Sequence, residues 1–323
     1  MLNKTKIQRS KNEKIFDVLT KEILSSNSLI KQNLLDSNPF YSYKDFQIKE
    51  TLEKIKDQRC LGYIKAFVEN DDSKSMYLKK YREQGNLKVR LIKNYNQNDE
   101  LVIINTAGGL TSGDLNFSSV NVGKGSIINL TTQSMEKVYK CKNLFAHNYT
   151  NIFAGPKSNV SWLPLETIFF NEGKLRRRIN IELDISSNFL GVESIIFGRK
   201  AMGEIVCKGE LDDAWQIYKN GKLLYSDFNR INGNIGHKLG FPLIMRGNSV
   251  LSNIVYTGKK IKSYKKKIIR LIDSTDIFAG TSIVNDVLLI KILAKDITEI
   301  RFFLEKLINI LDNDFSLPKI WSF

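Results

Sequence analysis

Three glycines and an aspartate follow closely on a strongly apolar run. The run is Leu101 to Ile104, and Gly108, Gly109, Gly113 and Asp114 come after it. This pattern is typical of a strand that enters a tight turn, because glycine adopts positive φ and lets another backbone approach closely. The segment lacks the lysine of a P-loop and does not match GxGxxG, so it predicts no nucleotide site. Asp114 either caps the turn or presents a carboxylate.

Two glutamates stand in apolar stripes. With strand periodicity, Glu166 shares a face with Trp162, Ile168 and Phe170, and Glu193 shares one with Phe189, Ile195 and Phe197. Burying a lone carboxylate costs several kcal/mol or raises its pKa, so we expect an arginine or internal water beside each. Arg199 continues the periodicity of Glu193 and is its candidate partner.

Two interpretations of these glutamates stay open. One is a buried Glu–Arg pair that fixes strand register, and the other is a polar passage or contact site inside a β fold. Both assume an unbroken strand, which Pro164 disfavours next to Glu166.

The residues that hold transition metals tightly are scarce. The chain has 3 cysteines and 2 histidines, with no CxxC or Cys/His zinc spacing. Cys141 and His147 are close in sequence, but a buried thiol and a surface histidine are favoured over a metal site. GxSxG, HExxH and Walker A motifs are absent, which argues against the common hydrolase and nucleotidase chemistries. The unpaired cysteines fit a reducing, cytoplasmic setting.

The elements that position these residues are mainly strands. Strands are predicted for 63–68, 87–92, 126–132 and 148–153. In Arg178 to Ile185, the residues Ile179, Ile181, Leu183 and Ile185 alternate with polar ones, which predicts a half-buried strand with a solvated face. Asn220-Gly221 between two β-rich runs, 215–219 and 222–226, predicts a type I′ hairpin.

The C-terminal third is mixed. Val287 to Ala294 reads as a buried strand, and Ile297 to Leu311 carries apolar residues at helical spacing, which predicts an amphipathic helix packed on a core. Residues 1–58 are rich in Lys, Asn, Ser and Asp and read as a basic N-terminal extension with short helical stretches such as Lys11 to Leu24. The rest of the chain, residues 59–323, is predicted to form one β-rich domain.

The formal net charge of the 323 residues is +15, which favours an acidic partner, a nucleic acid or an anionic membrane. No apolar stretch is long enough to predict a membrane span. The run Lys259 to Lys267 reads as a solvated basic patch.

Several motifs in order resemble the urease accessory protein UreD (UreH) family. They are Asn105 to Asp114, Leu130 to Lys140 with Lys137 and Tyr139, Trp162 to Ile168, Phe197 to Glu204, and Leu317 to Trp321. The resemblance covers about residues 60 to 323. Ser112, Lys140 and Lys319 depart mildly from the family pattern, and the extension 1–58 is longer than the family's usual start.

The resemblance implies a non-enzymatic scaffold with an elongated, stacked-sheet or β-helix-like fold and a small C-terminal helical part. Such proteins bind the urease apoprotein and UreF, which recruits the GTPase UreG, and assist nickel insertion. No tightly bound cofactor is expected, only Ni²⁺ in transit. The candidate residues for a nickel route or partner contact are Asp114, Glu166, Glu193, Arg199 and Glu204, and those of the family-motif loop are Gly108, Gly109, Gly113, Lys137 and Tyr139.

Two alternatives belong to other classes. A basic nucleic-acid-binding module would use Lys259 to Lys267, Arg176 to Arg178 and an exposed, base-stacking Tyr264, but no RNA- or DNA-binding signature supports specific binding. A hydrolase would use Asp114 and Glu166 as an acid/base pair, which their separation in sequence does little to support.

Overall fold

The structure is a computed structural model that describes residues 60–71, 75–95, 97–199, 203–311 and 315–321. The predicted extension 1–58 lies outside the described residues. None of the described helices is long and apolar enough to cross a membrane.

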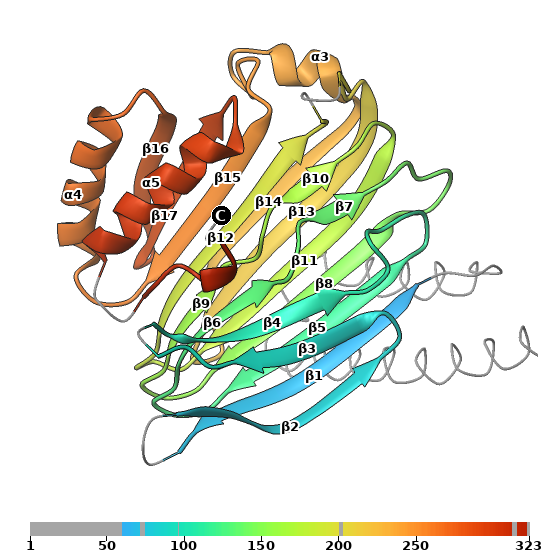
Figure 1. The fold of residues 1–323 in the computed structure, drawn as a ribbon. Coiled ribbons are helices and arrows are strands. Elements are labelled where there is room, and N and C mark those ends of the chain that lie inside the picture. The colour runs from blue at the N-terminus through green and yellow to red at the C-terminus, as the bar shows by residue number, and fades with distance from the viewer. Residues whose placement is uncertain (1–59, 72–74, 96, 200–202, 312–314, 322–323) are drawn as a thin grey trace, which may run out of the picture.

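Two β-sheets stack face to face (Figure 1). Sheet A has the order β14-β13-β11-β8-β5-β1-β2, formed by β1 (Leu61–Asn70), β2 (Met76–Gln84), β5 (Leu115–Val122), β8 (Ala146–Ala154), β11 (Gly173–Leu183), β13 (Lys208–Lys219) and β14 (Lys222–Asn234). Sheet B has the order β16-β17-β15-β12-β9-β6-β4-β3, formed by β3 (Leu87–Ile92), β4 (Asp99–Asn105), β6 (Ile127–Thr132), β9 (Asn159–Trp162), β12 (Asn188–Phe197), β15 (Val250–Thr257), β16 (Phe278–Val284) and β17 (Val287–Ala294). Two short strands, β7 (Glu136–Val138) and β10 (Thr167–Phe169), pair with each other, and β10 pairs with β12.

The chain winds between the two sheets as stacked coils. It passes from β4 in sheet B to β5 in sheet A, then to β6, β8, β9, β11, β12 and β13, so that each coil adds one strand to each sheet. Successive strands of one sheet are therefore parallel, as in β5–β8 and β8–β11. Antiparallel strands close the ends of both sheets, with β2 and β14 in sheet A and β3, β15, β17 and β16 in sheet B. The predicted fold class, a β-rich stacked-sheet scaffold with a small helical part, is confirmed.

Local sequence signals explain several elements. The predicted hairpin joins β13 and β14, and Asn220 and Gly221 have φ of 50° and 71°, which is the left-handed conformation that a type I′ turn requires. The buried strand predicted at Val287–Ala294 is β17, and the amphipathic helix is α5 (Ile297–Ile310), whose first turn is capped by Asp296. The alternation predicted for Arg178 to Ile185 ends early, because β11 stops at Leu183 and Ile185 is 71% exposed.

Helices cover the outward face of sheet B. Helices α4 (Ile261–Asp273) and α5 pack beside β15, β16 and β17 (Figure 1), while α3 (Ile235–Gly240) lies at the ends of β13 and β14, and a short 3₁₀ turn (Lys319–Trp321) follows near the C-terminus. The basic run Lys259 to Lys267 begins α4, which presents its lysines to solvent and buries Ile261 and Tyr264. The predicted base-stacking role of Tyr264 is therefore wrong: only 3% of it is exposed.

The core between the sheets has two apolar parts. One includes Ile152, Ile179 and Trp215, and the other includes Leu175, Leu211 and Phe197. On the inward side of β11, Leu175 belongs to the second part and Ile179 to the first. Arg177 is the inward-facing residue between these two, and it therefore faces the other sheet at the boundary of the two parts. A layer of polar side chains occupies this boundary.

Candidate functional site

The polar layer contains one inward-facing polar residue from each of several neighbouring strands. In sheet A the register aligns Asn116, Asn148, Arg177, Asp213 and Asn229 on β5, β8, β11, β13 and β14. In sheet B it aligns Glu193, Asn253 and Lys291 on β12, β15 and β17. On β5, β8, β11 and β13 the parallel winding produces this alignment, because equivalent positions of successive coils lie side by side, while β14, β15 and β17 join the layer through antiparallel pairing.

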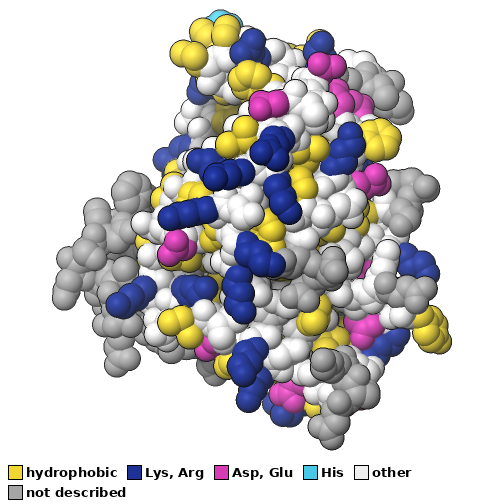
Figure 2. Space-filling view, turned by 90° about the vertical axis from the view of Figure 1, so that its left-hand side faces the viewer, with side chains coloured by type: hydrophobic (Ala, Val, Ile, Leu, Met, Phe, Trp, Pro, Cys, Tyr) yellow, Lys and Arg dark blue, Asp and Glu magenta, His cyan; other side chains and the backbone are white. Residues whose placement is uncertain are grey.

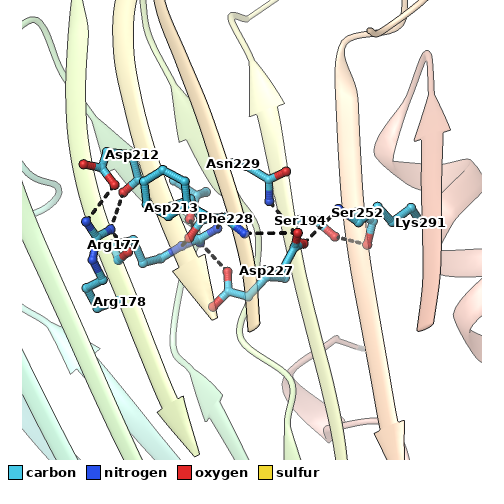
Figure 3. A network of polar contacts seen from close by, with 12 residues as sticks. Arg177, Arg178, Ser194, Asp212, Asp213, Asp227, Phe228, Asn229, Ser252 and Lys291 are labelled. Atoms are coloured by element: carbon cyan, nitrogen blue, oxygen red, sulfur yellow. Dashed lines mark hydrogen bonds and ion pairs between the residues drawn. The ribbon is translucent and has the colours of Figure 1, made fainter. Parts of the chain in front are cut away.

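Arg177 is the centre of the layer. Its guanidinium donates to both oxygens of Asp213 at 2.9 Å and to Glu193 Oε2 on the opposite sheet. Glu193 Oε1 accepts from Trp162 Nε1 at 2.9 Å. The side chains of the two acids and the arginine are at most 4% exposed, so this ion-pair network is buried between the sheets. At the sheet edge, Lys291 Nζ lies 2.8 Å from Asp227 Oδ2 and ties β17 to β14 (Figure 3).

One cation serves two buried carboxylates at this centre. Burial raises the pKa of Glu193 to about 7, with Arg177 opposing the rise and Asp213 adding to it. The same two carboxylates hold the pKa of the Arg177 guanidinium above its ordinary value. Glu193 is therefore poised between the neutral and the anionic form near pH 7.

A second titratable acid, Glu136 on β7, lies at the far end of the same interior. Asn105 Nδ2 donates to its two oxygens at 3.0 and 3.2 Å, and Asn86 connects Asn105 to Asn116 through contacts of 2.8 and 2.9 Å. Burial raises the pKa of Glu136 to about 7, although the Asn105 amide favours the carboxylate. The amides thus link Glu136 to the polar layer.

A cavity of about 60 Å³ lies between Glu136 and Glu193. That volume holds a few water molecules. Oxygen and amide groups dominate its polar lining, which is Asn105, Asn116, Ser118, Thr132, Ser134, Glu136, Asn148, Thr150, Thr167, Arg177 and Glu193. Gly108 and Gly109 line it as well, so the glycine-rich loop reaches the interior.

The glycine-rich loop packs on β7, as the close-approach role of glycine requires. Leu110 N donates to Lys137 O at 2.7 Å, and Tyr139 N donates to Leu110 O at 2.9 Å. A Cβ on Gly109, which has φ of 142°, would lie 2.6 Å from the Tyr139 ring and 2.7 Å from Lys137 O. Gly108 and Gly113 also have positive φ. The structure therefore brings the predicted family-motif residues of the two segments together.

Asp114 caps the end of this loop. Its Oδ2 accepts from Thr111 N at 2.8 Å and its Oδ1 accepts from Cys60 N at 2.9 Å, and only 3% of the residue is exposed. Of the two predicted roles, turn cap and presented carboxylate, the geometry matches the cap. Asp114 is not among the residues that line the cavity.

Glu166 lies on the other side of sheet B and does not line the cavity. Its two oxygens accept from Nε and Nη2 of Arg301 on α5, at 2.8 and 2.7 Å. An arginine partner was predicted, but the strand on which the prediction rested is interrupted: β9 ends at Trp162 and β10 begins at Thr167. This bidentate pair fastens α5 to the segment between the two strands.

The prediction that Arg199 pairs with Glu193 is wrong. Strand β12 ends at Phe197, Gly198 turns with φ of 80°, and Arg199 Nε donates to Glu204 Oε2 at 3.0 Å. Arg199 is half exposed and its guanidinium lies over the Phe170 ring. Arg199 and Glu204 therefore form a surface pair away from the polar layer.

His147 is buried rather than at the surface, which corrects a second prediction. Only 3% of it is exposed, its Nδ1 lies 3.2 Å from the Tyr149 hydroxyl, and burial lowers its pKa to about 3, helped by Arg176 and Arg178. Cys141 is a buried thiol, as predicted. Within the described residues, no group of three or more His, Cys, Asp or Glu side chains is placed to hold a metal ion.

Sequence reasoning missed Arg177, Asp213 and Glu136. A signal existed for the first two: Arg177 shares its strand face with Ile179, Ile181 and Leu183, and Asp213 shares one with Leu211 and Trp215. Charged residues on an apolar strand face indicate a buried pair. For Glu136 no comparable periodicity exists, since β7 has three residues.

Fold and site together define a class: a coiled two-sheet β protein whose interior carries a charged polar layer beside a small cavity. Comparison with known proteins gives the family. The model of the UreD urease accessory protein family matches residues 62–322, and the chain belongs to this family.

Curated relatives agree with this assignment. Urease accessory protein UreD of Rhizobium johnstonii is 36% identical over 240 residues, which is 74% of this chain and 87% of the relative. The UreD of Rhizobium leguminosarum bv. trifolii is 36% identical over 245 residues, 76% of this chain and 89% of the relative. The UreD of Agrobacterium fabrum is 30% identical over 274 residues, 85% of this chain and 95% of the relative. Family membership supports a role in urease maturation.

Proposed function

We propose that this chain is a non-enzymatic cytoplasmic scaffold that binds the urease apoprotein and UreF, with UreG recruited through UreF, and that Ni²⁺ passes through its polar layer during insertion. The observation that carries the proposal is the cavity between Glu136 and Glu193, to which the family-motif loop contributes Gly108 and Gly109. The loop therefore lines the space assigned to the ion.

The donor set of the cavity suits an ion in transit. Carboxylate, amide and hydroxyl oxygens bind a divalent first-row metal more weakly than imidazole or thiolate does, so the ion can leave. Glu136 and Glu193 can each take a negative charge near pH 7, which favours a cation, while the cavity has room for part of its hydration shell. Arg177 offsets part of that charge and limits how tightly the ion is held.

The surface charge suits an acidic partner. Figure 2 shows lysines and arginines gathered on the side of the molecule where α4 and α5 lie, with few acidic side chains among them. Helix α4 contributes the exposed Lys262, Lys266, Lys267 and Arg270. Complementary charge speeds encounter and orients docking, so this side is a candidate contact for an acidic surface of the urease complex.

The test is reconstitution with UreF, UreG and apo-urease, in which complex formation and nickel-dependent urease activity are both measured. Glu136→Gln keeps the shape of the side chain and removes its charge, and we expect an intact complex with at least a fivefold slower activation. Glu305→Gln on the exposed side of α5 is the matched control and should behave like the unmodified chain.

The two halves of the proposal fail separately. Absence of any complex with the unmodified chain would refute the scaffold role. A normal complex with Glu136→Gln and undiminished activation would refute the nickel path through this cavity and leave the scaffold role intact.

A further inference from the structure

The outward face of sheet A carries large apolar side chains. Because Asn116, Asn148 and Arg177 face sheet B, the neighbouring positions on their strands face away from it. On the first three parallel strands these outward residues include Leu61, Tyr63, Leu115, Phe117 and Tyr149, and Tyr63 stacks on Phe117 with ring centroids 5.8 Å apart. The face is therefore largely apolar near the start of β1, and its next outward row, Lys65, Ser119 and Asn151, is polar.

These outward residues are buried, although no described helix packs over them. They are at most 8% exposed, and they belong to none of the core clusters formed by the described residues. Helix α3 contacts β13 and β14, whereas α4 and α5 contact each other and strands of sheet B. His147, on the same face, is also buried. An apolar sheet face of this kind needs a cover.

The first described residue, Cys60, lies at the start of β1, beside the end of this face that carries Leu61 and Leu115. Cys60 N donates to Asp114 Oδ1, and Leu115 N donates to Cys60 O, which fixes the start of β1 beside β5. Cys60, the first described residue, therefore lies next to Leu61 and Leu115, and residues 1–58 come before it in the sequence. In the preceding sequence Ile15, Leu19 and Ile23 recur every fourth position, a spacing that gives a helix one apolar side.

We propose that residues 1–58 of this chain cover the outward face of sheet A, with the apolar residues around Leu19 packed on the aromatic residues of β1, β5 and β8. A second copy is a poorer cover, because two chains of net charge +15 repel each other. The family model begins at residue 62, so this cover is an addition of this chain to the part that the model matches.

Photo-cross-linking in the full chain tests the proposal. Lys65 is partly buried and lies on the outward side of β1, two positions from Tyr63, so p-benzoylphenylalanine at this position reports what lies over the face. The same amino acid in place of Phe302, which is 60% exposed on α5, is the control. The expected result is cross-linking from position 65, but not from 302, to peptides within 1–58.

A mixture of ¹⁴N- and ¹⁵N-labelled protein shows whether each cross-link joins residues of one chain. Cross-links within one chain support the proposal. Cross-links to another copy, cross-links that appear only when a partner protein is added, or none to peptides within 1–58 would overturn it.

A matched pair of substitutions tests the packing residues. Leu19→Asp should reduce the yield of the cross-link from position 65 at least fivefold, whereas Lys21→Asp, off the apolar side, should leave it unchanged. Equal yields in the two variants would overturn the packing assigned to Leu19. Should Leu19→Asp fail to fold, the cross-link in the otherwise unmodified chain still decides whether 1–58 is the cover.

Discussion

Glu193 on β12 and Glu166 in the segment between β9 and β10 are both buried, and they lie in different surroundings on the two sides of sheet B. Glu193 faces sheet A and shares Arg177 with a second carboxylate, Asp213. Glu166 faces α5, where Arg301 binds both of its oxygens. The first arrangement places two buried carboxylates on one arginine, and the second is a bidentate pair near the surface. The number of carboxylates per arginine, rather than burial alone, therefore distinguishes the polar layer from the Glu166–Arg301 pair, and the proposed nickel path runs through the polar layer for this reason.

The largest expected effect is that of Arg177→Met. The substitution leaves Glu193 and Asp213 buried without a cation, and breaking a buried pair in this way costs about 3–5 kcal/mol. Urea unfolding followed by circular dichroism measures the decrease in the free energy of unfolding. If the variant is too unstable to isolate, adding Glu193→Gln and Asp213→Asn should restore folding, and a loss below about 1 kcal/mol for Arg177→Met alone would contradict the buried-network interpretation.

Arg301→Met should cost less, about 2 kcal/mol, in the same unfolding measurement. Only one carboxylate loses its partner, and 17% of the Arg301 side chain is exposed, so water can reach the position that it leaves. A loss equal to that of Arg177→Met would remove the distinction between the two sides of sheet B.

The smallest effect concerns pH. Because the pKa of Glu136 is raised from 4.5 to about 7 in the folded protein, its contribution to stability is fully present below pH 4.5 and is lost as the pH rises to 7. Glu136→Gln removes this pH dependence. Relative to the unmodified chain, the free energy of unfolding of the variant should therefore rise between pH 4.5 and 7, by about 1–2 kcal/mol after allowance for partial exposure.

Urea unfolding at pH 5, 6, 7 and 8 measures this difference, and Glu305→Gln is again the control. If the free energies of unfolding of Glu136→Gln and the unmodified chain differed by the same amount at every pH, Glu136 would titrate in the folded protein as it does in the unfolded chain.

Local features of the fold were predictable from the sequence, and the pairing between sheets was not. The Asn220-Gly221 hairpin, the glycine-rich turn, β17 and α5 each depend on residues close together in the chain. The partners of the buried glutamates do not: Arg301 is 135 positions from Glu166, and Arg177 of sheet A is 16 positions before Glu193 of sheet B. Strand periodicity indicates that a side chain is buried, but it does not indicate which residue of another strand or helix faces that side chain. This is why the arginine partners were expected and Arg199 was the wrong choice for Glu193.

The coiled winding also determines where the chain tolerates changes of length. Each coil contributes to the polar layer by register, and side chains of a strand alternate between its faces. Inserting a single residue between Arg176 and Arg177 of β11 would turn the Arg177 guanidinium to the outside and place the inserted residue in the layer. Extra residues in the turns between coils leave the alignment unchanged. We therefore expect this chain to tolerate inserted residues in the turns between coils and not within the strands that contribute to the polar layer.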